Sequence, residues 1–303
     1  MDKTAHSTGP SQSGTQAPGP ATPPIFVMGA TGNVGGEIAR GLAASGVPFR
    51  VGVRRPEALD PGPLGPTAQV VVFDATRPET YGALDGVERM FLMWPPSTNA
   101  REHAFAVIDA ARARGVRQVV FLSILEAQRL SVLPHRAVER HLEASGLDWV
   151  FLRASYFMQN LSGVHRDDIR VRRQIVQPAG RGRTSFVDVR DVADVGVRAL
   201  LEGHRNVAYD VTGDVALDYG QVADIFSVTL GRRIEYADLS PWAFVRLERS
   251  LGTPPGLILV MAAQYVLARF GFAARVTPDV RRVLGRPART LRAFAEEFRE
   301  VWL

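Results

Sequence analysis

Three side chains that can donate a proton or a hydrogen bond lie in the middle of the chain. His135 begins a segment with helical spacing, Ser123 ends a strand-like run before it, and Tyr156 follows the next such run. Imidazole titrates near neutral pH and can therefore protonate a substrate. A hydroxyl at the end of a strand can stabilise a developing oxyanion. We therefore take His135 as the first candidate acid, Tyr156 as the second, and Ser123 as the candidate oxyanion donor.

Each candidate also has an ordinary structural explanation. His135 follows Pro134 and could be a first-turn helix residue that faces solvent. Ser123 could cap a turn, and the aromatic and Met cluster that begins at Tyr156 could be core packing. The same cluster could instead contact a flat apolar ligand. The candidate substrate contacts are Trp94, Tyr156, Phe157, Asn160 and Trp242.

A glycine-rich loop joins the first predicted strand to the first predicted helix. The run Gly29-Ala-Thr-Gly32-Asn-Val-Gly35 has the spacing of a dinucleotide-binding loop. The first glycine permits a tight turn, the second admits a pyrophosphate, and the third allows close packing of helix on strand. The helix N-terminus then offers free N–H groups to the phosphates. The alternative is a glycine turn that is purely structural.

The residue after the second strand indicates which dinucleotide is preferred. Arg54 stands where an NAD-selective site carries Asp or Glu, and a guanidinium there can pair with a 2′-phosphate. NADP(H) is therefore the predicted cofactor, unless Arg54 and Arg55 are merely solvated. Asp74 could bind the adenine amino group or cap a turn. The predicted cofactor contacts are Gly29, Thr31, Gly32, Asn33, Val34, Gly35, Arg54, Asp74, Ala75, Trp94 and Pro95.

The alternation of β-branched runs and helical segments predicts an α/β fold. We expect a Rossmann-type doubly wound parallel sheet with a small, mostly helical C-terminal substrate lobe. Residues 1–24 are rich in Ser, Thr, Gly and Pro, which predicts a disordered tail. Residues 25–212 are assigned to the NADP-binding domain, with 155–182 contributing to the substrate cleft. Residues 213–303 are assigned to the lobe.

Composition excludes several classes of function. The chain has no cysteine, and its only lysine is Lys3, so thiolate chemistry and a buried catalytic lysine are both excluded. The net charge is +5, but the arginines are scattered and no helix-turn-helix is evident. We therefore expect no nucleic-acid partner, no metal, no membrane segment, and a cytoplasmic protein. A homodimer is left open.

Several segments together resemble the NmrA-like family of atypical short-chain dehydrogenases/reductases. They are GATGNVG, GVRQVVFLS, VERHLEASGLDWVFLRASYFMQN, FVDVRDVADV and GRPARTLRAFAEEF. The resemblance runs over nearly the whole chain from Ile25. It implies an NAD(P)-binding Rossmann domain, a small C-terminal lobe and a cleft between them. That family contains NADPH-dependent quinone reductases, reductases of aromatic natural products, and members that sense the redox state of NADP.

Against a typical short-chain dehydrogenase, the chain lacks the catalytic Tyr and Lys. His135 stands in place of the Tyr, and Glu139 in place of the Lys. Hydride transfer itself needs only a nicotinamide held close to a good acceptor. We therefore predict an NADPH-dependent reductase of a quinone or an aromatic or polycyclic ketone, in natural-product tailoring or elsewhere. The alternative is a non-catalytic regulator that senses NADP(H).

Overall fold

A seven-stranded parallel sheet forms the centre of the computed structural model, which describes residues 22–94, 100–129 and 133–303. Its strand order is β3-β2-β1-β4-β5-β6-β9, and every neighbouring pair is parallel. The strands are β1 (Ile25–Met28), β2 (Phe49–Val53), β3 (Ala68–Val72), β4 (Arg89–Leu92), β5 (Gln118–Ile124), β6 (Asp148–Ala154) and β9 (Val207–Val211). The predicted doubly wound Rossmann sheet is thereby confirmed.

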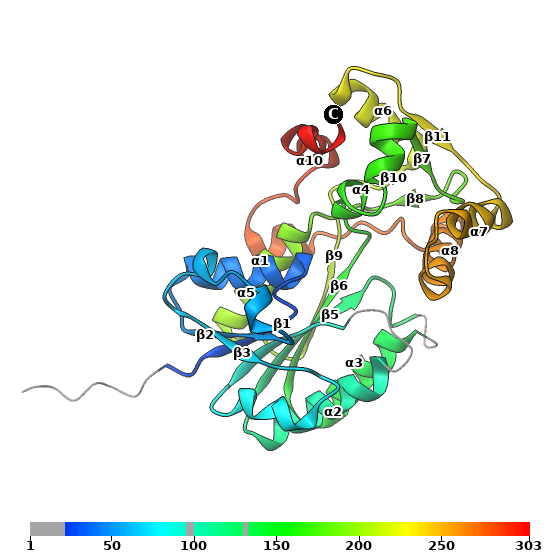
Figure 1. The fold of residues 1–303 in the computed structure, drawn as a ribbon. Helices are drawn as coiled ribbons and strands as arrows, with labels where there is room; N and C mark the ends of the chain where they lie inside the picture. Colours follow the sequence, from blue (N-terminus) through cyan, green and yellow to red (C-terminus); the bar gives the residue numbers. More distant parts are fainter. Residues whose placement is uncertain (1–21, 95–99, 130–132) are drawn as a thin grey trace, which may run out of the picture.

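Helices cover both faces of this sheet (Figure 1). Helices α1 (Asn33–Ala44) and α5 (Val189–Glu202) pack together on one face, and α2 (Ala100–Ala113) and α3 (Pro134–Ser145) pack on the other. The strand order reverses between β1 and β4. In such sheets a ligand binds beyond the carboxyl ends of the strands at this reversal.

A smaller lobe lies beyond the carboxyl ends of the strands (Figure 1). Its helices surround two short strand pairs, β7 with β11 and β8 with β10. The lobe elements are α4 (Gln159–Ser162), η4 (Asp168–Arg172), β7 (Gln174–Val176), β8 (Arg183–Thr184), β10 (Leu217–Asp218), α6 (Tyr219–Leu230), β11 (Glu235–Ala237), α7 (Pro241–Ser250), α8 (Pro255–Arg269), α10 (Leu291–Glu297) and η5 (Arg299–Trp302).

The packing does not divide the chain at residue 213. Met158 and Leu161 lie in the hydrophobic core of the lobe, so the segment after β6 belongs to it. Val280 and Val283, on α9 (Asp279–Leu284), pack in the core of the Rossmann unit. The chain therefore enters the lobe three times, after β6, after β9 and after α9, and it returns to the Rossmann unit between these crossings.

The run TSFVDV at 184–189 predicts a strand from its sequence pattern, and this prediction is wrong. Strand β8 ends at Thr184, and α5 begins at Val189 because the Asp188 carboxylate caps it by accepting from the backbone N–H of Arg190. Of the predicted tail, residues 1–21 lie outside the described residues. Among the residues that are described, no helix is long and apolar enough to cross a bilayer.

Candidate functional site

The glycine loop has the geometry that a dinucleotide requires. Gly29 has a φ of +76°, a conformation that favours glycine. A Cβ on Gly35 would lie 2.3 Å from the carbonyl oxygen of Gly29, so only glycine allows α1 to pack this close to the loop. The loop is closed by a hydrogen bond of 2.9 Å from the N–H of Gly32 to the same carbonyl.

Helix α1 begins without a side-chain cap. Its N-cap is Gly32, which has extended backbone and no side chain to accept from the first turn. Thr31 and Asn33 beside it are exposed, whereas Val34 is buried in the Rossmann core and can contact a ligand only through its backbone. Free N–H groups and the positive end of the helix dipole suit a pyrophosphate. The residues present therefore fit the phosphate-binding role predicted for this loop.

Arg54 is exposed at the carboxyl end of β2. Its charge acts on Asp74, which follows β3. Partial burial acts to raise the pKa of Asp74. Hydrogen bonds from the N–H and hydroxyl of Thr76 and the charge of Arg54 have a larger, opposite effect, so the pKa lies below its ordinary value. Asp74 thus caps its turn in this structure. The adjacent Ala75 is buried, and its carbonyl accepts from the Tyr81 hydroxyl at 2.7 Å.

Trp94 lies just beyond the carboxyl end of β4 and is half-buried. Its ring stacks on that of His103, with centroids 6.1 Å apart. This position borders the strand reversal, where the nicotinamide half of a dinucleotide would lie. Pro95, the other residue predicted here, lies outside the described residues.

His135 occupies the first turn of α3 and is half-buried, with its ring 6.3 Å from that of Phe121. Burial lowers the pKa of His135, and the charge of Glu139 one turn later acts in the opposite direction. The imidazole is therefore largely neutral at pH 7. The alternative for His135 was a first-turn helix residue that faces solvent. In the structure its side chain is only partly exposed.

Glu139 is fully buried and holds three partners at once. It accepts from the Ser123 hydroxyl at 2.7 Å, from Arg153 through two bonds of 2.9 Å, and from Arg136 at 3.1 Å. Two cations and a hydroxyl thus compensate the one buried carboxylate. The cations of this cluster are arginines, and the cluster contains no lysine.

The cluster alters the prediction for Ser123. The Ser123 side chain is 1% exposed, and its proton is directed to Glu139, so it does not donate to a substrate in this geometry. Arg153 and Arg136 were missed from sequence. Their only signal was the i, i+3 spacing of Arg136 and Glu139 and the strand-end position of Arg153.

Charged groups continue along the carboxyl edge of the sheet from Arg153. Asp210 lies directly opposite Arg153 in the β6–β9 register, and burial raises its pKa although Arg275 and Arg153 act to lower it. Arg275 pairs with Asp210 at 3.1 Å and with Glu126, which follows β5, at 3.3 Å. None of these was identified from the sequence, because Arg275 is remote in the chain.

Tyr156 points into the lobe. Its hydroxyl lies 2.9 Å from Nε2 of His165 and 3.0 Å from the hydroxyl of Tyr265, which is itself 2.9 Å from the same nitrogen. Burial raises the pKa of Tyr156 to about 12. Its weak acidity and committed hydroxyl do not favour a role as proton donor. Nothing in the local sequence distinguishes His165 from a surface residue, but it is 2% exposed in the structure.

The other predicted substrate contacts are dispersed. Phe157 packs against the Rossmann core and forms a bridge with Val187. Asn160 orders its turn, since its N–H donates to the Phe157 carbonyl and its own carbonyl accepts from the N–H of His165. Trp242, on α7, is 81% exposed and lines neither the hollow on the lobe nor the small one at the amino end of the sheet.

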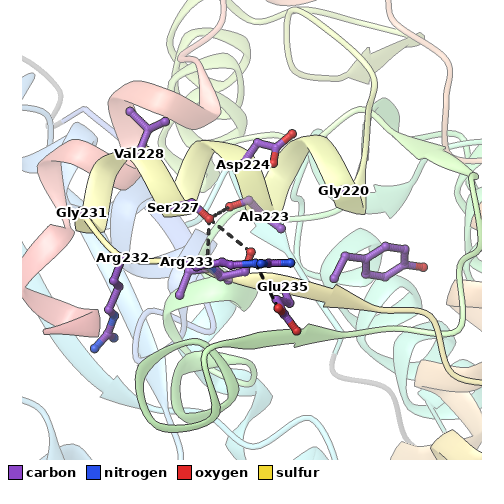
Figure 2. A pocket seen from close by; sticks show the side chains of 11 residues that line it. Gly220, Ala223, Asp224, Ser227, Val228, Gly231, Arg232, Arg233 and Glu235 are labelled. Carbon is purple, nitrogen blue, oxygen red and sulfur yellow. Dashed lines mark hydrogen bonds and ion pairs between the residues drawn. The ribbon is translucent and has the colours of Figure 1, made fainter.

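A hollow of about 790 Å³ lies elsewhere, on the lobe between α6 and β11 (Figure 2). Ser227 on its floor bonds to the backbone of Ala223 and Ile234, and Arg233 pairs with Glu235 at its rim. None of its lining residues comes from the carboxyl ends of the sheet strands. It is therefore separate from the candidate cofactor site.

Comparison with known proteins agrees with this reading of the glycine loop. The family model described as "NAD(P)H-binding" matches residues 29–202, more than half of the chain. This chain belongs to the NAD(P)H-binding family. The NAD(P)H azoreductase of Xenophilus azovorans is 32% identical over 284 residues, which cover 90% of this chain and 96% of that protein.

Solved structures agree as well. An NADPH-dependent quinone oxidoreductase from Escherichia coli, complexed with NADPH, has a TM-score of 0.82 and 25% identity, covering 90% of this chain and 99% of that one. The negative transcriptional regulator NmrA, in complex with NADP, shares the fold with a TM-score of 0.76 at 16% identity, covering 92% and 96%. The NAD(P)-binding Rossmann domain implied by the family resemblance is thus confirmed, and NmrA shares its fold.

Proposed function

We propose that this NAD(P)H-binding protein is an NADPH-dependent reductase of flat conjugated acceptors such as quinones and polycyclic ketones. The observation that carries the proposal is the pairing of an uncapped α1 N-terminus with an exposed Arg54 at the end of the neighbouring strand β2. The first suits a diphosphate and the second a 2′-phosphate. The azoreductase and quinone oxidoreductase relatives support a conjugated acceptor.

The bound nicotinamide would supply the hydride. The chain's own residues would hold the dinucleotide at the glycine loop and place Trp94 and His135 beside the acceptor, at the carboxyl ends of β4 and β5. Quinones need little acid assistance because they accept hydride readily. A half-buried His135 can provide the one proton that the reduced acceptor takes up, either directly or through water.

The test is turnover of NADPH with a panel of quinones, azo dyes and polycyclic ketones, followed by loss of NADPH absorbance. Arg54→Gln should raise the KM for NADPH about tenfold or more, since it removes a charge-assisted contact. The KM for NADH should change little. Arg117→Gln is the control, because Arg117 is 75% exposed at the amino end of the sheet. Equal KM values for NADPH in both variants would contradict the assignment.

A second function has one observation in its favour. The position of the ribose-binding lysine is occupied by Glu139, whose charge is fully compensated by Arg153 and Arg136. A protein without this lysine could bind NADP(H) as a sensor, and the NmrA regulator shares the fold. Absence of turnover on the whole panel, together with unequal affinities for NADP⁺ and NADPH, would favour the sensor.

A further inference from the structure

Helices α7 and α8 and the loop that follows them form an arm at the edge of the lobe, residues 241–276 (Figure 1). Only one narrow side of α8 packs inward. Its buried residues Ile258, Met261, Tyr265 and Ala268 face the hydrophobic core of the lobe or lie beside it.

The rest of the arm exposes large apolar side chains. Eight of them have between 38% and 81% of their surface accessible. They are Trp242, Leu251, Leu257, Leu259, Val260, Phe270, Phe272 and Val276. A contiguous stretch of chain with so many exposed apolar groups marks an interaction surface.

The exposed side chains of α8 face away from the lobe. At about 100° of rotation per residue, Leu259 and Val260 both project from the side opposite the buried residues of the helix, and Leu257 lies at its flank. An extended surface can therefore contact Leu259 and Val260 at the same time.

Arginines dominate the charge of the arm itself. Two of them have acidic partners outside it, since Arg269 pairs with the exposed Asp238 and Arg275 pairs with Asp210 and Glu126. Between residues 241 and 276 the sequence has four arginines and one acidic residue, Glu248, which is buried and accepts from the Thr253 hydroxyl. Arg246 and Arg249 are exposed on α7 and form no ion pair with any described residue. The arm therefore exposes apolar and cationic groups without an exposed carboxylate.

Two more arginines border the end of α8. A Cβ on Gly182 would lie 2.1 Å from the carbonyl oxygen of Ala268, so the segment 181–183 lies against the last turn of this helix. Arg181 and Arg183 in that segment are exposed and, within the described ranges, unpaired with any acid. They extend the positive rim of the arm.

We propose that the α7–α8 arm docks on an anionic phospholipid surface. Exposed Trp and Phe side chains would enter the boundary between headgroups and acyl chains, and the arginines would pair with the phosphates. A second copy of the chain is a poorer occupant, because symmetric pairing would bring Arg246 and Arg249, which have no acidic partner among the described residues, near the same arginines of the other copy. This inference does not depend on the reductase proposal.

The experiment is co-sedimentation of the full chain with vesicles of phosphatidylcholine alone and of phosphatidylcholine mixed with phosphatidylglycerol. We expect binding to the anionic vesicles that weakens as salt is added, and little binding to the neutral ones. Emission from the exposed Trp242 should shift to shorter wavelength on binding, and Trp242→Phe should remove that shift.

Variants separate the arm from a general effect. Leu259→Glu, and separately the pair Arg246→Glu and Arg249→Glu, should reduce the bound fraction about tenfold or more. Val228→Glu is the matched control, since Val228 is 69% exposed on α6 outside the arm. NADPH binding by every variant, measured by calorimetry, reports whether it has folded.

Three outcomes would overturn the proposal. The first is binding to neither vesicle, and the second is equal binding to both. The third is a concentration-dependent dimer that Leu259→Glu dissociates, which would assign the face to a second copy. None of these outcomes bears on NADPH turnover. The turnover measurement therefore decides the reductase proposal, whatever the result with vesicles.

Discussion

Glu139 and His135 share one helical face at the carboxyl edge of the sheet but differ in their partners. The Glu139 carboxylate is paired with Arg153, Arg136 and Ser123. The imidazole has no such partner among the described residues, and burial lowers its pKa. The chemistry available at this edge therefore depends on a neutral histidine beside a compensated ion cluster.

His135 should impose a pH dependence on turnover. If its protonated form donates the proton, kcat falls as pH rises through a pKa below the ordinary value of 6.5. A pH profile of His135→Gln should lack that decline. His204→Gln is the control, because His204 lies near the amino end of β9 and pairs with Glu202. An unchanged profile in His135→Gln would assign the proton to water.

Replacing Glu139 should destabilise the fold. Glu139→Gln leaves Arg153 and Arg136 without the buried carboxylate and should cost about 3 kcal/mol in the free energy of unfolding, measured with denaturant. Glu143→Gln removes a partly exposed partner of Arg136 on the same helix and should cost less than about 1 kcal/mol. Similar losses in the two variants would show that the buried cluster contributes no special stability.

At the scale of elements, the contact of α1 with the β1 loop decides whether the phosphate site exists. Gly35 lets the first turn of the helix approach the loop carbonyls. Gly29 adopts the left-handed backbone conformation that orients these carbonyls toward the helix. The N-terminus of α1 then faces the carboxyl edge of the sheet with its N–H groups free of any side-chain cap.

Gly35→Ala should therefore weaken NADPH binding. The added Cβ would lie 2.3 Å from one backbone oxygen and 2.9 Å from another, so α1 must move away from the loop. We expect the Kd for NADPH in calorimetry to rise about tenfold or more. Gly256→Ala, whose Cβ would have no neighbour within 4 Å in α8, should leave the Kd unchanged. A Gly35→Ala protein with native affinity would refute the phosphate role of this loop.

At the scale of the whole molecule, ion pairs join the C-terminal segment to the Rossmann unit. Arg190 at the start of α5 pairs with Asp188 and with Glu297 of α10. Asp191, also on α5, accepts from Arg286 and Arg289. These pairs hold the last part of the chain against the sheet, so lobe and sheet should unfold together.

Asp188 should make that stability depend on acid pH. Burial acts to raise the pKa of Asp188, but the hydrogen bonds and charge of Arg190 and the hydrogen bond from Gln159 outweigh it. The pKa in the folded protein therefore lies below the ordinary 3.8. Its contribution is complete above pH 3.8 and is lost as pH falls through the lower value. Asp188→Asn should cost about 2 kcal/mol at pH 7, and thermal unfolding should show this difference shrinking below pH 3.8. Asp224→Asn, an exposed site on α6, should show no such convergence.

Much of the sheet could be predicted from local pattern. The sequence pattern predicts strands at 25–28, 49–53 and 207–211 and a helix at 241–250. These are the bounds of β1, β2, β9 and α7, because apolar spacing and flanking turn residues are local signals. The short strands β7 and β11 were missed, since three residues carry too little pattern. Helix α9 was missed as well, and its packing on α5 and β9 depends on contacts remote in sequence.

The sequence by itself determined the glycine loop, the charge of Arg54 and the absence of any lysine other than Lys3, because these follow from residue identity and local spacing. Only the tertiary structure decided which groups face one another. The Ser123 hydroxyl forms a hydrogen bond with Glu139, and the Tyr156 hydroxyl forms hydrogen bonds with His165 and Tyr265. These partners lie up to 109 positions away in the sequence. A hydroxyl bonds to whichever group folding brings within 3 Å of it, and spacing along the chain does not encode that distance.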